Sequence, residues 1–335
     1  MDIKQLEKTL NREPSFRLKQ AQKAVFQDLI DDWGRATVFS LALREKLKRE
    51  VPLEIAAKLF VAADQKTVKS LIGLADGLKV EAVLMRYPKR NTVCVSSMVG
   101  CPLNCEFCAT GKMGFKRNLS DGEIVEQVLF FNRYLKKSGQ RVNSLVFMGM
   151  GEPFLNCDSV FSAVEFFNRP ESFNIGARHI SISTVGIIEG IKKLTQSSLP
   201  VNLAISLHAA DDETRSKIMP INRRYPLREV LEAVEEYLQK TRRKVMFEYI
   251  MIRGINDSLN QAQKLVRLLS GLRKSLYLVN LIAYNPTGIF KPSSSEQIQG
   301  FKKVLEKQGI EVTERYRFGR QIQAACGQLA IDDEE

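Results

Sequence analysis

Three cysteines lie within eight residues of the sequence stretch VGCPLNCEFCATG. Cys101, Cys105 and Cys108 follow the spacing C-x3-C-x2-C, in a chain of 335 residues that holds six cysteines in all. Thiolates on so tight a loop can converge on one soft metal centre. Structural zinc sites usually carry paired C-x2-C units and four protein ligands, whereas an iron–sulfur cluster held by three thiolates leaves one iron open to a substrate. The spacing favours such a cluster; a zinc site completed by another cysteine or a histidine stays open as an alternative.

The elements that must position these cysteines repeat one theme along the chain. An apolar, β-rich run is followed each time by a stretch of helical periodicity, and the six runs are NTVCVSSMVG, SLVFMGMG, RHISIST, VNLAISLH, KVMFEYIMI and YLVNLIAYN. Six strand–helix repeats predict an α/β fold with a parallel sheet and right-handed crossovers. We expect this sheet to be open or curled into a partial (βα)6 barrel of the TIM type.

A chemically distinctive residue or pair follows each of the six predicted strands. These signatures are the three cysteines, then Gly149 with Gly151 and Glu152, Ser183 with Thr184, Ser206 with His208, Arg253 with Asn256, and finally Asn285. In parallel α/β folds the active site lies at the carboxyl ends of the strands. We therefore expect the six signatures to converge on one site.

The chain outside the repeats divides into smaller regions. Four segments near the amino terminus, QLEKTL, RLKQAQKAVFQDLIDDW, TVFSLALREKLKREV and PLEIAAKLFV, have apolar residues at helical spacing. Two alternating apolar runs around Asp76 and Gly77 predict a β-hairpin. The expected regions are a helical unit (1–65), a hairpin extension (66–90), the α/β core (91–318) and a C-terminal segment (319–335).

The composition is that of a soluble globular protein, with 44% hydrophobic and 26% charged residues. No apolar run approaches the roughly 20 residues of a membrane span, and no signal peptide begins the chain, so we expect a cytoplasmic protein without a membrane partner. Lys and Arg outnumber Asp and Glu by 50 to 38, with clusters in RLKQAQK, REKLKRE, RYPKR and KTRRK. Any one cluster could be a solvated face; together they favour an anionic partner such as RNA or DNA.

Several stretches resemble the radical S-adenosylmethionine (SAM) superfamily and, within it, the RlmN/Cfr family of ribosomal RNA adenosine methyltransferases. They are VCVSSMVGCPLNCEFCATGKMGFKRNL, VFMGMGEPFLN, ISLHAADDETRSKIMPIN, YIMIRGIND and AACGQLA. The resemblance implies that Cys101, Cys105 and Cys108 bind a [4Fe-4S] cluster whose open iron chelates SAM and whose electron cleaves it to a 5'-deoxyadenosyl radical. It implies that SAM is held by Gly151, Glu152, Ser183, Ser206, His208 and Asn285. On the sequence alone, the histidine could equally be a structural cap.

Two isolated cysteines carry the most specific part of this resemblance. It implies that Cys326 is methylated first, and that a radical on that methyl group then adds to adenine C2, a carbon without a lone pair. It also implies that Glu81 takes the C2 proton and that Cys94 resolves the protein–RNA crosslink through a disulfide with Cys326. Without the resemblance, Cys94 would be a buried inert cysteine, Cys326 a tail thiol and Glu81 an exposed strand residue. Cys157 has no assignable role.

The resemblance implies methylation of C2 of an adenosine in the peptidyl transferase region of 23S rRNA, using two SAM molecules, with tRNA as a second candidate substrate. It implies an electron donor such as flavodoxin or ferredoxin, and we expect a monomer. Because Pro153 in MGMGEP matches RlmN better than Cfr, C2 is favoured over C8. A radical SAM activase of another protein would explain the cluster but not Cys94 and Cys326. A non-catalytic iron–sulfur RNA-binding protein would not cleave SAM.

Overall fold

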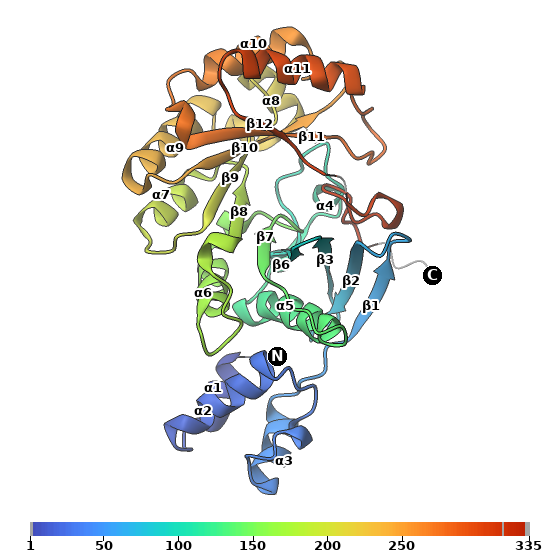
Figure 1. Cartoon of the computed structure of the whole chain (residues 1–335), viewed down its shortest axis with the longest axis vertical. Helices are drawn as coiled ribbons and strands as arrows, with labels where there is room; N and C mark the ends of the chain where they lie inside the picture. Colours follow the sequence, from blue (N-terminus) through green and yellow to red (C-terminus); the bar gives the residue numbers. More distant parts are fainter. Residues whose placement is uncertain (1–2, 317, 332–335) are drawn as a thin grey trace.

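The computed structural model describes residues 3–316 and 318–331, and its centre is a ten-stranded sheet (Figure 1). The strands follow the order β1 (Ala57–Val61), β2 (Thr67–Gly73), β3 (Lys79–Tyr87), β4 (Arg90–Val95), β7 (Ser144–Phe147), β8 (Ile180–Thr184), β9 (Asn202–Ser206), β10 (Val245–Met251), β11 (Tyr277–Ala283) and β12 (Val312–Glu314). Strands β1 to β4 pair antiparallel, and β4 to β12 pair parallel. The parallel sheet predicted from the six apolar runs is confirmed.

A helix follows each of the six predicted strands, as the periodicity indicated. These helices are α5 (Asp121–Lys136), α6 (Cys157–Asn168), α7 (Ile188–Gln196), α9 (Leu227–Thr241), α10 (Leu259–Leu269) and α11 (Ser295–Lys307). Helix α5 shows why they form: Ser120 and Glu123 make a reciprocal capping box, and Ile124, Val128 and Leu135 bury one face. The short helix α8 (Asp212–Ile218) and strand β12 were not predicted.

Three helices form the amino-terminal end of the molecule, α1 (Ile3–Leu10), α2 (Ser15–Gln22) and α3 (Leu41–Glu50). They lie at the lower end of Figure 1, below α5 and α6. The ring of Phe26 packs on Phe166 at 4.8 Å and on Phe173 at 5.3 Å between centroids. The guanidinium of Arg133 in α5 donates to the Leu53 carbonyl at 2.6 Å. Apolar and polar contacts therefore join these helices to the core.

The prediction of a helix for the fourth segment, PLEIAAKLFV, is wrong. Its residues 57–61 form strand β1, which pairs antiparallel with β2, Ala57 opposite Ile72. Most of β1 is exposed, so the hydrogen-bonded ladder with β2 stabilises it more than burial does. Pairing with β2, rather than the helical spacing of its apolar residues, therefore determines the conformation of this segment.

The predicted hairpin around Asp76 and Gly77 is confirmed, because the two residues lie in the turn between β2 and β3. Strand β3 also pairs with β4, so the hairpin continues the main sheet. Buried apolar side chains form one continuous cluster from the amino-terminal helices to α11. Within the two described ranges, no helix has the length and apolar character needed to cross a membrane.

The described part of the C-terminal segment, residues 319–331, lies beside α4 (Ala109–Lys112) and the upper ends of β2 and β3 (Figure 1). The Ala109 amide donates to the Gly327 carbonyl at 2.8 Å, and the Thr110 hydroxyl donates to the Leu329 carbonyl at 2.7 Å. The last residues of the described chain are thereby fastened over the carboxyl ends of the strands.

Candidate active site

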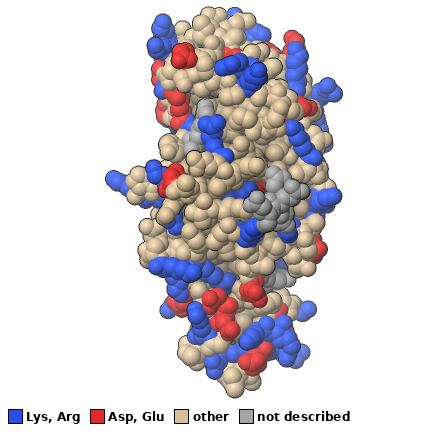
Figure 2. All heavy atoms as spheres, turned by 90° about the vertical axis from the view of Figure 1, so that its right-hand side faces the viewer, with Lys and Arg blue, Asp and Glu red and all other residues tan. Residues whose placement is uncertain are grey.

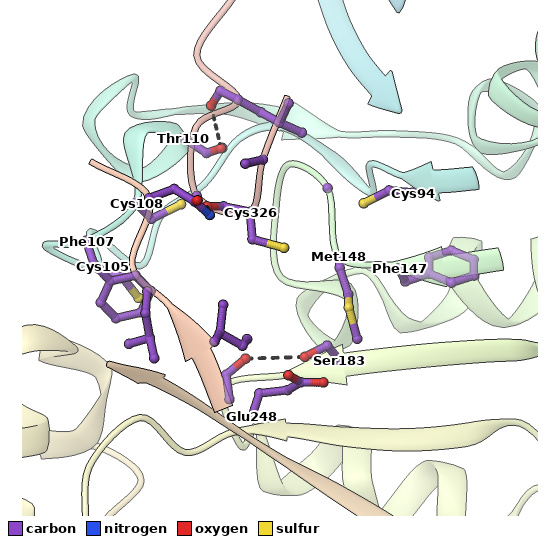
Figure 3. Close-up of a pocket in the computed structure, with 18 of the residues that line it drawn as sticks. Cys94, Cys105, Phe107, Cys108, Thr110, Phe147, Met148, Ser183, Glu248 and Cys326 are labelled. Carbon is purple, nitrogen blue, oxygen red and sulfur yellow. Dashed lines mark hydrogen bonds between the residues drawn. The ribbon is translucent and has the colours of Figure 1, made fainter. Parts of the chain in front are cut away.

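The carboxyl ends of the parallel strands border a cavity, and the C-terminal segment covers it (Figure 3). Most of the residues predicted to form a site line this cavity: Cys94, Cys101, Cys105, Cys108, Gly149, Gly151, Glu152, Ser183, Ser206, His208, Asn285 and Cys326. Three residues that we expected there, Thr184, Arg253 and Asn256, do not line it. Asn256 is instead structural, because its amide donates to the His208 carbonyl at 2.7 Å.

A small two-stranded sheet frames the cysteine loop: β5 (Met98–Gly100) pairs with β6 (Phe115–Asn118). The loop is anchored further where the Glu106 amide donates to the Ile218 carbonyl at 3.0 Å. Burial raises the pKa of Cys101 to about 12 and the pKa of Cys105 well above its ordinary value. Both side chains are therefore protonated until a metal displaces the proton.

The three cysteines fit an iron–sulfur cluster better than a single metal ion. Among residues 3–316 and 318–331, no three His, Cys, Asp or Glu side chains are placed to hold one ion. A cubane cluster takes each thiolate on a different iron, so its ligands stand farther apart than those of one zinc ion. The structure thus gives no support to the zinc alternative. All six cysteines are free thiols, so it shows no disulfide either.

The loop after β7 carries Gly151 and Glu152 into the cavity. Gly151 has φ +97°, and a Cβ atom there would lie 2.6 Å from the Met98 side chain, so only glycine fits. The Glu152 carboxylate accepts hydrogen bonds from the amides of Phe154 at 3.0 Å and Val185 at 2.9 Å. Burial raises the pKa of Glu152 to about 7. This buried carboxylate faces the cavity and forms no ion pair with any described residue, so it suits the amino group of a ligand such as SAM.

Two serines and a histidine come from adjacent strand ends. The hydroxyls of Ser183 on β8 and Ser206 on β9 lie 3.2 Å apart (Figure 3). His208 Nδ1 accepts a hydrogen bond from the Ile250 amide at 3.1 Å, and its ring meets Phe107 edge-on at 5.0 Å. The histidine therefore does serve as a cap of strand β10, and it also lines the cavity.

Asn285, from the loop after β11, connects the ligand side of the cavity to Cys326. Its side-chain nitrogen donates to the Cys326 carbonyl at 3.2 Å. Its buried Oδ1 has no hydrogen-bond partner within the described part of the chain. An orphaned buried acceptor is costly unless something fills it. Together with Glu152, this atom shows that the cavity fits a polar ligand such as SAM.

The two isolated cysteines of the sequence meet in the same cavity. Cys326 is half-buried between the cysteine loop and Met148, and Cys94 lies buried on β4 next to the Met148 backbone (Figure 3). Burial raises the pKa of Cys94 to about 12, and the nearby Cys326 adds to the effect. Cys157 is outside the cavity and donates from its sulfur to the Phe154 carbonyl at 3.2 Å. Cys94 and Cys326 therefore share the cavity, whereas Cys157, which has no assigned role, lies outside it.

Glu81 lies on β3 and does not line the cavity. It is only 1% exposed, so the alternative of an exposed strand residue is wrong. One carboxylate oxygen is 2.8 Å from the Lys69 ammonium, and the other accepts from the Ile331 amide at 3.1 Å. Glu81 thus holds the end of the described C-terminal segment.

Two charged residues that line the cavity were not predicted from the sequence, Glu248 on β10 and Arg315 after β12. Their side chains lie 3.7 Å apart, and the Arg315 guanidinium donates to the Met148 sulfur at 3.0 Å. The pKa of Arg315 is raised above its ordinary value, chiefly by Cys326 and then by Glu248. A charged residue in the middle of the apolar run KVMFEYIMI was the available signal for Glu248.

Comparisons with known proteins agree with this geometry. The family described as "Radical SAM superfamily" matches residues 95–266. The "Probable dual-specificity RNA methyltransferase RlmN" of Chloroflexus aurantiacus is 45% identical, over 95% of this chain and 88% of that protein. The "Ribosomal RNA large subunit methyltransferase Cfr" of Bacillus velezensis is 43% identical, over 95% and 93%. The crystal structure of a radical SAM methyltransferase from Sphaerobacter thermophilus has a TM-score of 0.93 at 41% identity, covering 98% and 97%.

These likenesses cover nearly the whole chain, not only its α/β core. Radical SAM proteins bind a [4Fe-4S] cluster and SAM, so these are the cofactors of this protein, and the cavity that holds Cys101, Cys105 and Cys108 fits them. The cavity, its thiols and the extent of the likeness lead to one conclusion: this chain belongs to the radical SAM superfamily and, within it, to the RlmN/Cfr family.

Proposed function

We propose that this protein is a radical SAM methyltransferase that methylates C2 of an adenosine in the peptidyl transferase region of 23S rRNA. The observation that carries the proposal is the meeting of Cys94 and Cys326 in the cavity that also holds the three cluster cysteines. A ligand-binding radical SAM site needs only the cluster cysteines. Two more thiols in the same cavity indicate that the protein itself carries the methyl group.

Each step assigns a task to a residue of this chain. The bound cluster and SAM supply a methyl group and a radical that removes one hydrogen atom. Cys326 accepts the methyl group on its sulfur, and the carbon radical made from that methyl group adds to adenine C2. The adduct then gives up one electron, for which the cluster, oxidised when SAM is cleaved, would be the acceptor. Glu81 takes the C2 proton. The Cys94 thiolate then attacks the Cys326 sulfur, and the electron pair of the sulfur–carbon bond passes to the carbon on the RNA, which takes up a proton to become the methyl group. A transient Cys94–Cys326 disulfide remains, and an external thiol would reduce it.

The position of Glu81 sets a condition on this sequence of steps. Its carboxylate is engaged by Lys69 and by the Ile331 amide, and it does not line the cavity. Glu81 can reach a proton on the substrate only after the C-terminal segment shifts. Because that segment also carries Cys326, one movement would free the base and reposition the methyl carrier.

The partners follow from the same proposal. Relatives named as dual-specificity RNA methyltransferases support a second RNA substrate, for which we propose tRNA. The net charge of +12 suits an RNA partner. We propose that residues 1–65 contribute to RNA binding, that residues 91–318 are the radical SAM core with a partial (βα)6 barrel, and that flavodoxin or ferredoxin supplies the electron.

Methylation at C8 is the near alternative, since RlmN and Cfr relatives match at 45% and 43% identity. The choice of C2 rests on Pro153 in MGMGEP. The activase and the non-catalytic RNA-binding protein remain weaker, because neither gives Cys94 and Cys326 a reason to share the cavity.

The test is anaerobic. The cluster is reconstituted, SAM, a reductant and a fragment of large-subunit rRNA are added, and methyladenosines are identified by mass spectrometry. The native protein should yield C2-methyladenosine, Cys326→Ala none, and Cys94→Ala a protein–RNA crosslink that persists. Cys157→Ala is the matched control, because that thiol lies outside the cavity. C8-methyladenosine would select the alternative, and methylated RNA from Cys326→Ala would refute the carrier role.

A further inference from the structure

An aromatic side chain at the cavity is left open to solvent. Tyr316 lines the cavity. Its side chain is 61% exposed, more than any other aromatic side chain among the described residues. Its ring meets Phe318 edge-on, with 4.7 Å between centroids, and Phe318 meets Tyr87 in the same way, also at 4.7 Å. Three rings therefore form a continuous stack from the cavity to strand β3.

Packing explains the inner rings of this stack but not the outer one. Phe318 is 8% exposed and fastens the C-terminal segment to β3 through Tyr87. Tyr316 touches only one neighbour in the stack and leaves most of its ring to water. Burial of the ring thus contributes little to folding, and Tyr316 lines the same cavity as Cys326.

The surroundings of the stack are basic. The Arg90 guanidinium lies 4.3 Å from the centre of the Tyr87 ring, and Lys89 and Arg90 are both exposed. Arg320, on the C-terminal segment, is exposed as well. Figure 2 shows the face to which the hairpin and this segment belong, with Lys and Arg spread over its middle part and few acidic side chains among them. Such a face attracts the phosphates of a nucleic acid.

We infer that Tyr316 is a stacking platform for an RNA base at the entrance of the cavity. An exposed ring backed by a second ring, on a face that also carries exposed cations, is the kind of surface on which proteins stack unpaired bases. The inference rests on the proposed function and adds a binding residue to it. A base that leaves its helix to reach the cavity loses stacking in the RNA, and the open face of Tyr316 replaces it.

Two variants of one side chain test the inference. Tyr316→Leu keeps an apolar group and removes the ring, and Tyr316→Phe keeps the ring and removes the hydroxyl. Each is reconstituted as the full chain and compared with the native protein in three assays. They are the kcat/KM for methylation of the rRNA fragment, the affinity for the same fragment by fluorescence anisotropy, and methylation of Cys326 in the absence of RNA, by protein mass spectrometry.

Loss of base stacking should lower kcat/KM for RNA by about 5- to 150-fold in Tyr316→Leu, with weaker RNA affinity. Tyr316→Phe should stay close to the native protein in both assays. A structural defect would instead lower RNA-free methylation of Cys326 in Tyr316→Leu as much as it lowers RNA methylation, and that result would overturn the inference. So would native kcat/KM and affinity in Tyr316→Leu.

The same assays separate this inference from the proposed function. Failure of the native protein to methylate RNA, with Cys326 methylated normally, would refute the proposed function. In that case the anisotropy measurements still test whether Tyr316 stacks an RNA base. Weaker RNA binding by Tyr316→Leu than by Tyr316→Phe supports this role, and equal binding by the two variants refutes it.

Discussion

The imidazole of His208 combines a structural hydrogen bond with a place in the ligand cavity. Its backbone has φ +59°, the left-handed region, and its Nδ1 must be unprotonated to accept from the Ile250 amide. Burial lowers the pKa of His208 from its ordinary 6.5 to about 3, and the nearby Arg215 adds to the effect. The folded protein therefore keeps this ring neutral throughout the physiological pH range.

This pKa predicts a pH-dependent loss of stability that one substitution removes. As pH falls below about 6.5, the unfolded chain binds a proton at His208 while the folded chain does not, so the free energy of unfolding falls by up to about 1.4 kcal/mol per pH unit until about pH 3. His208→Asn keeps an acceptor, and Asn tolerates the left-handed backbone. Urea unfolding of the metal-free proteins at pH 7.5, 6.5 and 5.5 measures the difference. Equal pH dependence in both proteins would contradict the low pKa.

Residues of the candidate site that belong to recognisable sequence motifs were predictable, and site residues outside such motifs were not. The three cysteines and Glu152 stand in stretches whose residue types already suggest chemistry, whereas Cys326 was found only through the resemblance of AACGQLA to the family. Arg315 has no such context, and the signal for Glu248 was a single charge within an apolar run. Their proximity arises only when β10 and the chain after β12 come together in space. Contacts between residues so far apart in sequence depend on strand order, which local patterns do not specify.

At the level of secondary structure, long periodic segments were predictable and short ones were not. The six core strands and the helices after them each bury a full face, which leaves a clear pattern in the sequence. Strands β5 and β6 have three and four residues, too few for a period to show. They form because the Cys101 amide donates to the Gly114 carbonyl at 3.1 Å and the two strands close the cysteine loop.

This small sheet provides a matched pair of glycine substitutions. Gly100 and Gly114 have φ of +75° and +72°, so alanine costs about 1–2 kcal/mol of backbone strain at either. At Gly100 a Cβ would also lie 1.8 Å from the Gly114 carbonyl oxygen, whereas at Gly114 it would meet nothing within 4 Å. We expect Gly100→Ala to lose about 1–3 kcal/mol more than Gly114→Ala.

The second readout of this pair is the iron bound after anaerobic reconstitution. Displacement of the Gly114 carbonyl would move the neighbouring Cys101, so Gly100→Ala should retain less iron than Gly114→Ala. Thermal unfolding of the metal-free proteins and iron determination on the same samples make the comparison. Similar iron content in both variants would show that this sheet does not position the cysteine loop.

On the scale of the whole molecule, the amino-terminal helices lie away from the cavity. Arg133 and Lys136, in the last turn of α5, donate to carbonyls of this unit, and Phe166 near the end of α6 packs on Phe26. Helices that follow parallel strands end near the amino ends of those strands, on the side opposite the cavity. An RNA that touches both the amino-terminal helices and the cavity must therefore extend along the long axis of Figure 1.

A charge reversal tests whether RNA extends that far. In the cluster REKLKRE, Lys46 supports the fold by donating to the Thr9 carbonyl at 3.0 Å, so it is left unchanged. Lys48 and Arg49 have side chains 63% and 74% exposed, and their ion pairs with Asp32 and Glu50 are worth little at such exposure. Replacing both by glutamate should weaken binding of the rRNA fragment without changing the fold.

The decisive quantity is the salt dependence of that binding. Each RNA phosphate that no longer pairs with a protein cation should reduce the slope of log K against log salt by about 0.7 to 0.9. Arg228 and Lys240 on α9 provide the control pair, because they are 88% and 54% exposed and form similar surface ion pairs far along the molecule. If reversal at Lys48 and Arg49 changes the slope no more than reversal at Arg228 and Lys240, the amino-terminal helices do not bind RNA phosphates. A smaller slope for the first pair alone would mean that the RNA reaches the amino-terminal helices.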